Sequence, residues 1–294
     1  MSFISYLING ISLGSVYALI ALGYTMVYGI AKMLNFAHGD VIMVGAFITY
    51  TMCSTMGLSP VIGVLAAVIA CTLLGMAIEK VAYKPLRKAS SPLAVLITAI
   101  GVSYLLQNLA TYITGGIARA YPDIPFLTQV MQMGSLSVKR ITIVTPILTI
   151  VLVVILVILI QKTKIGMAMR AVSRDFETSQ LMGIKINSVI SMTFAIGSFL
   201  AGVASILYFA NYGQVSPMIG AMPGLKAFVA AVFGGIGSIP GAVIGAFIIG
   251  ICESFIKANE NIAVFSNAFT FALLIIILLC KPNGLFGEKL TEKV

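Results

Sequence analysis

The sequence is a succession of apolar runs, most of them long enough to cross a lipid bilayer. A helix needs about 20 consecutive apolar residues to span a hydrocarbon core of about 30 Å. Eight runs are present, at residues 7–30, 41–56, 60–78, 92–113, 141–160, 189–212, 225–255 and 263–280. Backbone polar groups in lipid must be satisfied within each segment, and these runs are much longer than barrel strands, so they predict helices. The predicted fold class is therefore all-α, a polytopic membrane helical bundle of about eight spans in one domain, 1–294.

Composition and charge placement agree with a membrane protein. Hydrophobic residues make up 60% of the chain and charged residues 9%, whereas soluble domains carry about 25% charged residues. The net charge of +9 lies in short segments between the runs, which is typical of topology signals rather than of nucleic-acid binding. The basic loops 79–91 and 161–187 are predicted to be cytoplasmic, and 114–140 external. The first 31 residues carry no charge, so the first run is predicted to be a retained span.

Two of the runs are irregular. Run 41–56 is short for a full crossing, and run 225–255 is interrupted by a glycine-rich stretch at 234–241. Broken segments are tolerated at membrane depth only where protein or a water-filled cavity satisfies the freed backbone groups. We therefore expect a transport pathway to be lined near these two places. Their positions near opposite ends of the chain suggest a weak internal duplication, which transporters often carry.

The sequence gives little support for a catalytic function. His38 is the single histidine, and the four cysteines are read as small buried hydrophobes. No nucleotide-binding, metalloprotease or nucleophile-elbow motif occurs, and the nine acidic residues are expected to lie in loops and tails. We expect no catalytic residue, metal or cofactor in this chain.

The segment 166–183 is predicted to form one amphipathic helix from Met167 to Met182, ended by Gly183 as a C′ residue. Its predicted apolar side carries Met167, Ala171, Phe176 and Met182. Two interpretations stay open on composition alone. The helix lies on the lipid headgroups, or it docks into a groove of a cytoplasmic partner.

Glu177–Gly183 resembles the EAA loop of ABC importer permeases, in which a helix of the loop couples to the ATPase. This chain has Thr178 and Ser179 where that motif has two alanines. The resemblance implies that the ATPase-coupling residues are Arg170, Ala171, Asp175, Glu177, Ser179 and Gly183.

Further stretches resemble the LivH-type permeases of bacterial branched-chain amino acid ABC transporters. They are 23–29 with 34–40, 233–242, and the tail 281–287. The pathway or signature residues implied are Asn35, Phe36, His38, Gly39, Asp40, Gly234, Gly235, Gly237, Pro240 and Gly241. For the polar members two interpretations remain. Asn35 and Asp40 cap helix ends while a carbonyl satisfies His38, or these side chains belong to the substrate path or its gate.

The family resemblance implies a transport subunit, not an enzyme, for leucine, isoleucine and valine in the bacterial cytoplasmic (inner) membrane. It implies three kinds of partner besides membrane lipid. These are a second, LivM-like permease, two cytoplasmic ABC ATPases that use ATP and Mg²⁺, and a periplasmic amino-acid-binding protein. One alternative is a urea or short-amide ABC permease, whose signature carries Met where this chain has Phe36. Another is a stand-alone secondary transporter, which the lack of a buried Asp/Glu relay within the spans argues against.

Overall fold

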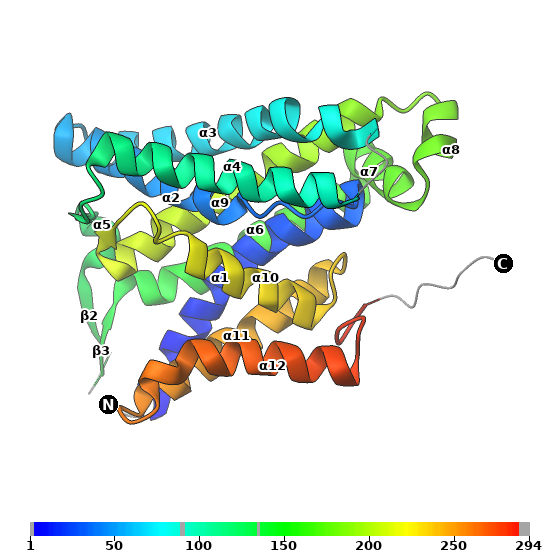
Figure 1. Ribbon diagram of the computed structural model, residues 1–294. Helices are drawn as coiled ribbons and strands as arrows, with labels where there is room; N and C mark the ends of the chain where they lie inside the picture. The colour runs from blue at the N-terminus through cyan, green and yellow to red at the C-terminus, as the bar shows by residue number, and fades with distance from the viewer. Residues whose placement is uncertain (1–2, 89–91, 134–135, 288–294) are drawn as a thin grey trace.

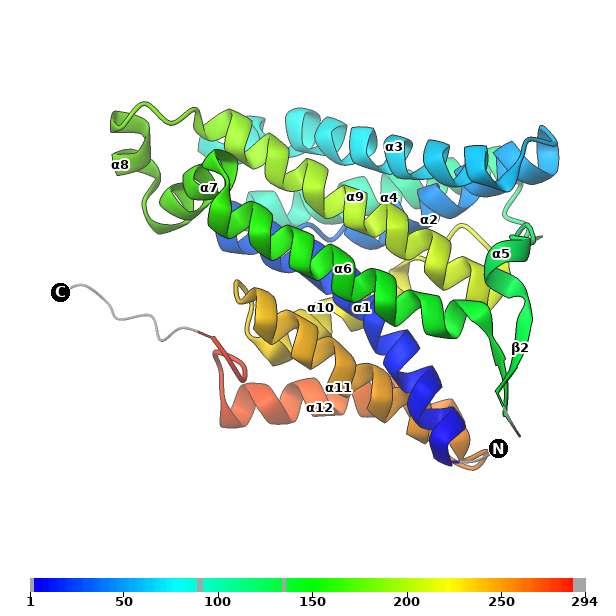
Figure 2. The ribbon, with the colours of Figure 1, turned by 180° about the vertical axis from the view of Figure 1, so that it is seen from behind.

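The computed structural model describes residues 3–88, 92–133 and 136–287, which form a bundle of helices (Figures 1 and 2). The α-helices are α1 Phe3–Ala31, α2 His38–Tyr50, α3 Pro60–Ile78, α4 Pro92–Thr114, α5 Pro125–Thr128, α6 Arg140–Lys162, α7 Lys164–Arg174, α8 Phe176–Leu181, α9 Ile186–Tyr212, α10 Ala221–Gly234, α11 Ile239–Ala258 and α12 Ser266–Cys280. Within the described ranges, seven helices are long and apolar enough to cross a membrane. The predicted class, a polytopic membrane helical bundle, is confirmed. Residues 89–91, at the end of the first basic loop, lie outside the described residues.

Both irregular runs take unusual backbone forms. Helix α2 has 13 residues and continues into a π-helical turn, η1 (Thr51–Thr55). A second π-helical turn, η2 (Glu79–Tyr83), extends α3 and is followed by a 3-10 turn, η3 (Pro85–Lys88). Run 225–255 is divided between α10 and α11, and the break has a local cause. Gly235 and Gly237 adopt φ angles of +107° and +98°, which side chains with a Cβ rarely adopt.

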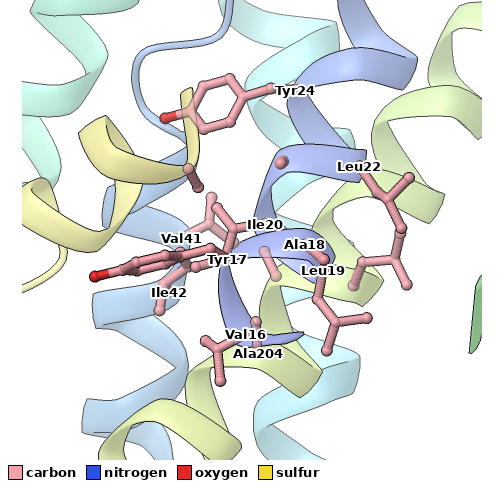
Figure 3. Packing of buried hydrophobic residues seen from close by; sticks show 14 of the residues in the cluster. Val16, Tyr17, Ala18, Leu19, Ile20, Leu22, Tyr24, Val41, Ile42 and Ala204 are labelled. Carbon is pink, nitrogen blue, oxygen red and sulfur yellow. The ribbon is translucent and has the colours of Figure 1, made fainter. Parts of the chain in front are cut away.

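Helices α1 and α9 form the centre of the bundle. In the apolar stretch of each helix, 72% of the residues are buried in α9 and 50% in α1, against 6% in α4 and 11% in α12. The outer helices therefore face lipid or a partner chain. Figure 3 shows Tyr17 and Ile20 of α1 beside Val41 and Ile42 of α2, with Ala204 of α9 close by.

Small residues bring α1 and α11 together. A Cβ placed on Gly14 would lie 2.9 Å from the Cα of Phe247, and one on Gly10 would lie 2.8 Å from the Cα of Ile251. Gly10 and Gly14 thus form a close helix contact, which is typical of small residues spaced four apart in membrane helices. Gly245 packs in the same way against Ala230 and Gly234 of α10.

The two halves of the chain are arranged alike. Helix α1 leads through a non-helical stretch into the short helix α2, and α9 leads through another into the short helix α10. Helix α1 packs against α10 and α11, whereas α9 packs against α2 and α3. This reciprocal packing is typical of an inverted structural duplication.

The two ends of the bundle differ in character. One end carries α5, the hairpin of β2 (Val130–Met133) with β3 (Leu136–Lys139), and the pairing of β1 (Arg119–Ala120) with β4 (Gln214–Val215). Helices α7 and α8 lie at the opposite end (Figures 1 and 2). There Arg87 donates a hydrogen bond of 2.5 Å to Asn187, so the two basic loops share one end. Their assignment to the cytoplasm stays a prediction.

Candidate functional site

The chain doubles back after α1, so that α2 begins inside the bundle. His38, the first residue of α2, packs against Gly23 of α1, where a Cβ would collide with the imidazole ring. Gly23 lies eight residues before the end of α1, which is about 12 Å at about 1.5 Å per residue. The polar group predicted from the sequence therefore lies within the bundle and not at its surface.

Side chains of this re-entrant stretch reach other helices instead of capping α2. Asn35 accepts a hydrogen bond from the Tyr83 hydroxyl at 3.1 Å. The Asp40 carboxylate accepts from Ser103 at 2.5 Å and from Gln107 at 2.9 Å, both on α4. The N-cap residue of α2 is Ala37, which makes no side-chain capping bond. The capping interpretation of Asn35 and Asp40 is therefore wrong, because their side chains join α2 to η2 and α4.

His38 is buried, and its ring lies edge-on to Tyr24 with centroids 4.9 Å apart. Its Nε2 atom makes no hydrogen bond of standard geometry to the described residues, but the backbone carbonyl of Ile20 on α1 interacts with the ring. The interpretation that a neighbouring carbonyl satisfies His38 therefore stays open. Phe36 is half-buried, and its ring lies 5.6 Å from that of Phe228 on α10.

The beginnings of the two short helices meet. A Cβ on Gly39 would lie 2.7 Å from the carbonyl oxygen of Gly220, and one on Gly224 would lie 2.8 Å from the Cα of Gly39. Only glycine permits this approach of α2 to α10. The signature stretch 34–40 is thereby fixed against the beginning of α10, although about 180 residues separate the two in sequence.

The glycine-rich break after α10 lies under the C-terminal tail. The amides of Leu285 and Phe286 donate to the carbonyls of Phe233 and Gly234, each at 2.9 Å. Ser238 caps α11 by accepting from the Gly241 amide at 3.3 Å. Pro240 stands in the first turn of α11, where a missing amide donor costs nothing. Gly234 and Gly241 contact each other closely. The two C-terminal signature stretches, 233–242 and 281–287, thus form one structural unit.

The segment predicted as one helix consists of two. Asp175 has an extended backbone, ends α7, and caps α8 by accepting from the amides of Glu177 and Thr178 at 2.9 and 3.1 Å. Aspartate is a favoured N-cap because its carboxylate satisfies these free amides. The prediction of an unbroken helix from Met167 to Met182 is therefore wrong. The predicted end is confirmed, since Gly183 follows α8 with a φ of +82°.

The predicted apolar side of this segment does not form one face. Met167 and Met182 are 59% and 78% exposed, while Ala171 and Phe176 are half-buried. The residues that α7 buries against the bundle are Gly166, Met169 and Val172.

The predicted coupling residues divide between surface and interior. Arg170, Asp175 and Glu177 are exposed, and Ser179 is buried. Arg170 also donates to the Ile160 carbonyl at the end of α6. Helix α8 leaves Leu181 88% exposed beside Met182. Two large apolar side chains are thus exposed at this end of the bundle.

Sequence reasoning missed a set of buried carboxylates. Besides Asp40, Glu79 and Glu253 have fully buried side chains. Glu79 pairs with Arg87 and accepts from Ser191 of α9 at 2.5 Å. Burial lowers the pKa of the Arg87 guanidinium, and the charge of Glu79 opposes that shift. The expectation that the acidic residues lie in loops and tails is wrong for these three.

Glu253 belongs to a charged cluster that faces a cavity. One carboxylate oxygen lies 2.6 Å from the Nζ atoms of both Lys226 and Lys257, and the other accepts from the Tyr17 hydroxyl at 2.9 Å. The cavity lies between α1, α9, α10 and α11 and has a volume of about 330 Å³. None of the signature residues named from the sequence lines it. The available signal was a glutamate near the end of an apolar run, four residues before a lysine.

Comparison with known proteins places the whole chain in one family. A family profile described as "Branched-chain amino acid transport system / permease component" matches residues 6–278. The high-affinity branched-chain amino acid transport system permease protein BraD of Pseudomonas aeruginosa is 40% identical, over 99% of this chain and 98% of that protein. The permease protein LivH of Escherichia coli K12, of the same description, has the same identity and coverage.

A solved structure, PsaBC from Streptococcus pneumoniae in complex with Fab, matches with a TM-score of 0.50 and 14% identity. The match covers 96% of this chain and 94% of that chain. At this identity the likeness concerns the fold alone. The full-length matches at 40% identity and the family profile show that this chain, a multi-pass membrane protein and not an enzyme, belongs to the permease component family of branched-chain amino acid transport systems.

Proposed function

We propose that this chain is one permease subunit of an ABC importer that carries leucine, isoleucine and valine across the bacterial cytoplasmic membrane. The observation that carries the proposal is the 40% identity, over almost the full length of both chains, with permeases named for that transport. In this proposal a second, LivM-like permease completes the pathway, and a periplasmic binding protein delivers the amino acid. Two cytoplasmic ABC ATPases hydrolyse ATP, since the chain carries no phosphate-binding loop of its own.

The end of the bundle with α7 and α8 supports a role in ATPase coupling. Helix α8 presents the exposed apolar side chain of Leu181, and the exposed Met182 follows it directly. The charged residues Arg174 of α7 and Glu177 of α8 are exposed as well. Such a helix fits a groove of another protein by its apolar residues and is oriented by its charges. Helix α7 packs its buried face against α1 and α9. A displacement of α8 by a bound partner would therefore be transmitted through α7 to these central helices.

Transport by the reconstituted complex tests the proposal. Proteoliposomes should hold this chain with the permease, ATPases and binding protein encoded beside it. Uptake of labelled leucine, isoleucine and valine is measured with and without internal ATP, and urea and acetamide serve as competing substrates. We expect ATP-dependent uptake that excess urea does not reduce. Uptake of urea in place of leucine would support the short-amide alternative. Uptake by the permease alone, driven by an ion gradient, would support a secondary transporter.

A further inference from the structure

The cavity beside Glu253 lies toward the hairpin end of the bundle. It is lined by the first half of α1, the end of α9, the beginning of α10 and the end of α11. The N-terminus lies near the β2–β3 hairpin, opposite α7 and α8, in both views (Figures 1 and 2). If α7 and α8 face the cytoplasm, this cavity faces the side from which an importer receives its substrate. Its volume of about 330 Å³ falls at the lower end of the range of about 300–1,000 Å³ for small-molecule sites.

The cavity carries an unbalanced positive charge. Two lysines share the single carboxylate of Glu253, so the three side chains sum to one net positive charge. The two lysines differ in access. The side chain of Lys226 is 6% exposed, whereas that of Lys257 is 51% exposed and reaches the shared oxygen from the next turn of α11. Lys257 is thus the member of the cluster that is free to turn toward a ligand.

Stability does not explain such a cluster. Charges within membrane spans are costly, and they commonly mark substrate pathways. A buried ion pair also often stabilises a fold no more than apolar residues of similar volume, because the cost of desolvating the two charges offsets their attraction. Here the side chains sit at a cavity wall together with the donors and acceptors Asn9, Tyr17 and Asn211. The same wall carries the apolar residues Leu13, Val16 and Leu207.

We propose that this cavity binds a zwitterionic aliphatic α-amino acid, with Lys257 and Lys226 recognising its α-carboxylate and Glu253 its α-ammonium group. The inference rests on the proposed function and names the site for its substrate. The two lysines supply one cation more than Glu253 neutralises, which suits a carboxylate. Glu253 remains the acceptor for an ammonium group, and Leu13, Val16 and Leu207 offer an apolar surface to the side chain. A phosphate fits less well, because the carboxylate of Glu253 between the lysines repels a dianion.

The first test measures leucine uptake by the reconstituted complex carrying Lys257→Gln. Because Lys257 is half-exposed, the variant keeps the Lys226–Glu253 pair and should fold. Lys257→Arg restores the charge, and Lys139→Gln makes the same change on the hairpin, outside the cavity. We expect Lys257→Gln to lower the uptake rate at least about tenfold, the scale of one lost charged hydrogen bond. Lys257→Arg should regain most of the rate, and Lys139→Gln should match the unmodified complex.

The second test measures protection by ligand. In a background lacking the four native cysteines, Asn211→Cys places a thiol on the cavity wall, and Gln129→Cys places one at the same end of the bundle outside the cavity. The rate of maleimide labelling is measured in the complex with leucine, isocaproate, isoamylamine or inorganic phosphate. Leucine should slow labelling at 211 and not at 129. Isocaproate, which lacks the ammonium group, and isoamylamine, which lacks the carboxylate, should protect weakly.

The outcomes separate this inference from the proposed function. If the unmodified complex takes up no branched-chain amino acid, the proposed function fails. If it transports leucine and Lys257→Gln transports equally well, only the assignment of this cavity fails. Protection by phosphate without protection by leucine would show a plain anion site, and protection by isocaproate equal to that by leucine would remove the role of Glu253.

Discussion

Replacing Gly183 by valine tests whether α8 transmits force to the ATPases. Gly183 follows α8 with a φ of +82°, a conformation that a β-branched residue adopts only under strain. A Cβ at this position would meet no atom within 4 Å. The substitution therefore adds backbone strain without a steric clash, which makes its magnitude simple to derive.

Strain from a non-glycine residue in this backbone region costs about 1–3 kcal/mol. Helix α8 has six residues, so the chain relieves the strain by unwinding its last turn rather than by unfolding the bundle. The population that presents Leu181 and Met182 in the docked geometry then falls by about 5- to 160-fold, because about 1.4 kcal/mol corresponds to a factor of ten. Gly183→Ala lacks the β-branch and should lie at the lower end of this range.

The assay is the number of leucine molecules taken up per ATP hydrolysed in proteoliposomes that hold the full complex, with subunit incorporation quantified separately. We expect Gly183→Val to lower this ratio by at least about fivefold while the complex still assembles. Gly57→Val is the matched control. Gly57 has a φ of +66°, also without an atom within 4 Å of its Cβ, but it precedes α3 and not α8. A Gly183→Val complex that assembles and keeps the unmodified ratio would refute the role of α8 and favour a helix that only rests on lipid headgroups.

Three further predictions follow from the sequence and the packing. The purified chain should show no saturable binding of labelled ATP at micromolar concentration, because it has no phosphate-binding loop; measurable binding would contradict the division of labour proposed above. In whole cells, and in a background lacking the four native cysteines, an impermeant maleimide should label Gln129→Cys and not Gln180→Cys, because the basic loops are retained inside, and the reverse pattern would overturn the topology. Gly14→Val should lower the thermal stability of the purified chain by overpacking α1 against Phe247, at a cost of about 1–3 kcal/mol. Gly101→Val on α4, where a Cβ meets nothing within 4 Å, should unfold at a temperature close to that of the unmodified chain, and equal losses of stability for both variants would contradict the close packing of α1 on α11.

The sequence by itself determined the helical membrane class and the positions of most helices. Hydropathy over about 20 residues is a local property, and a bilayer converts it into a span without reference to the rest of the chain. Gly183 was also predictable, since the end of a helix demands a left-handed residue that glycine supplies. The break at Asp175 depended on one capping side chain. The prediction missed it because an aspartate within a polar stretch reads equally well as helix surface.

Only the tertiary structure decided which polar residues come together. Glu253 meets Lys226 and Tyr17, which are 27 and 236 positions away in sequence, and Asp40 meets Gln107 on α4 at a separation of 67. No local pattern encodes these contacts, because they arise from the packing of α1 on α11 and of α2 on α4. The cavity depends on that packing as well. The sequence determined which segments enter the membrane, and the tertiary structure decided where the buried charges meet, because a buried charge is placed by its partners and not by its neighbours in sequence.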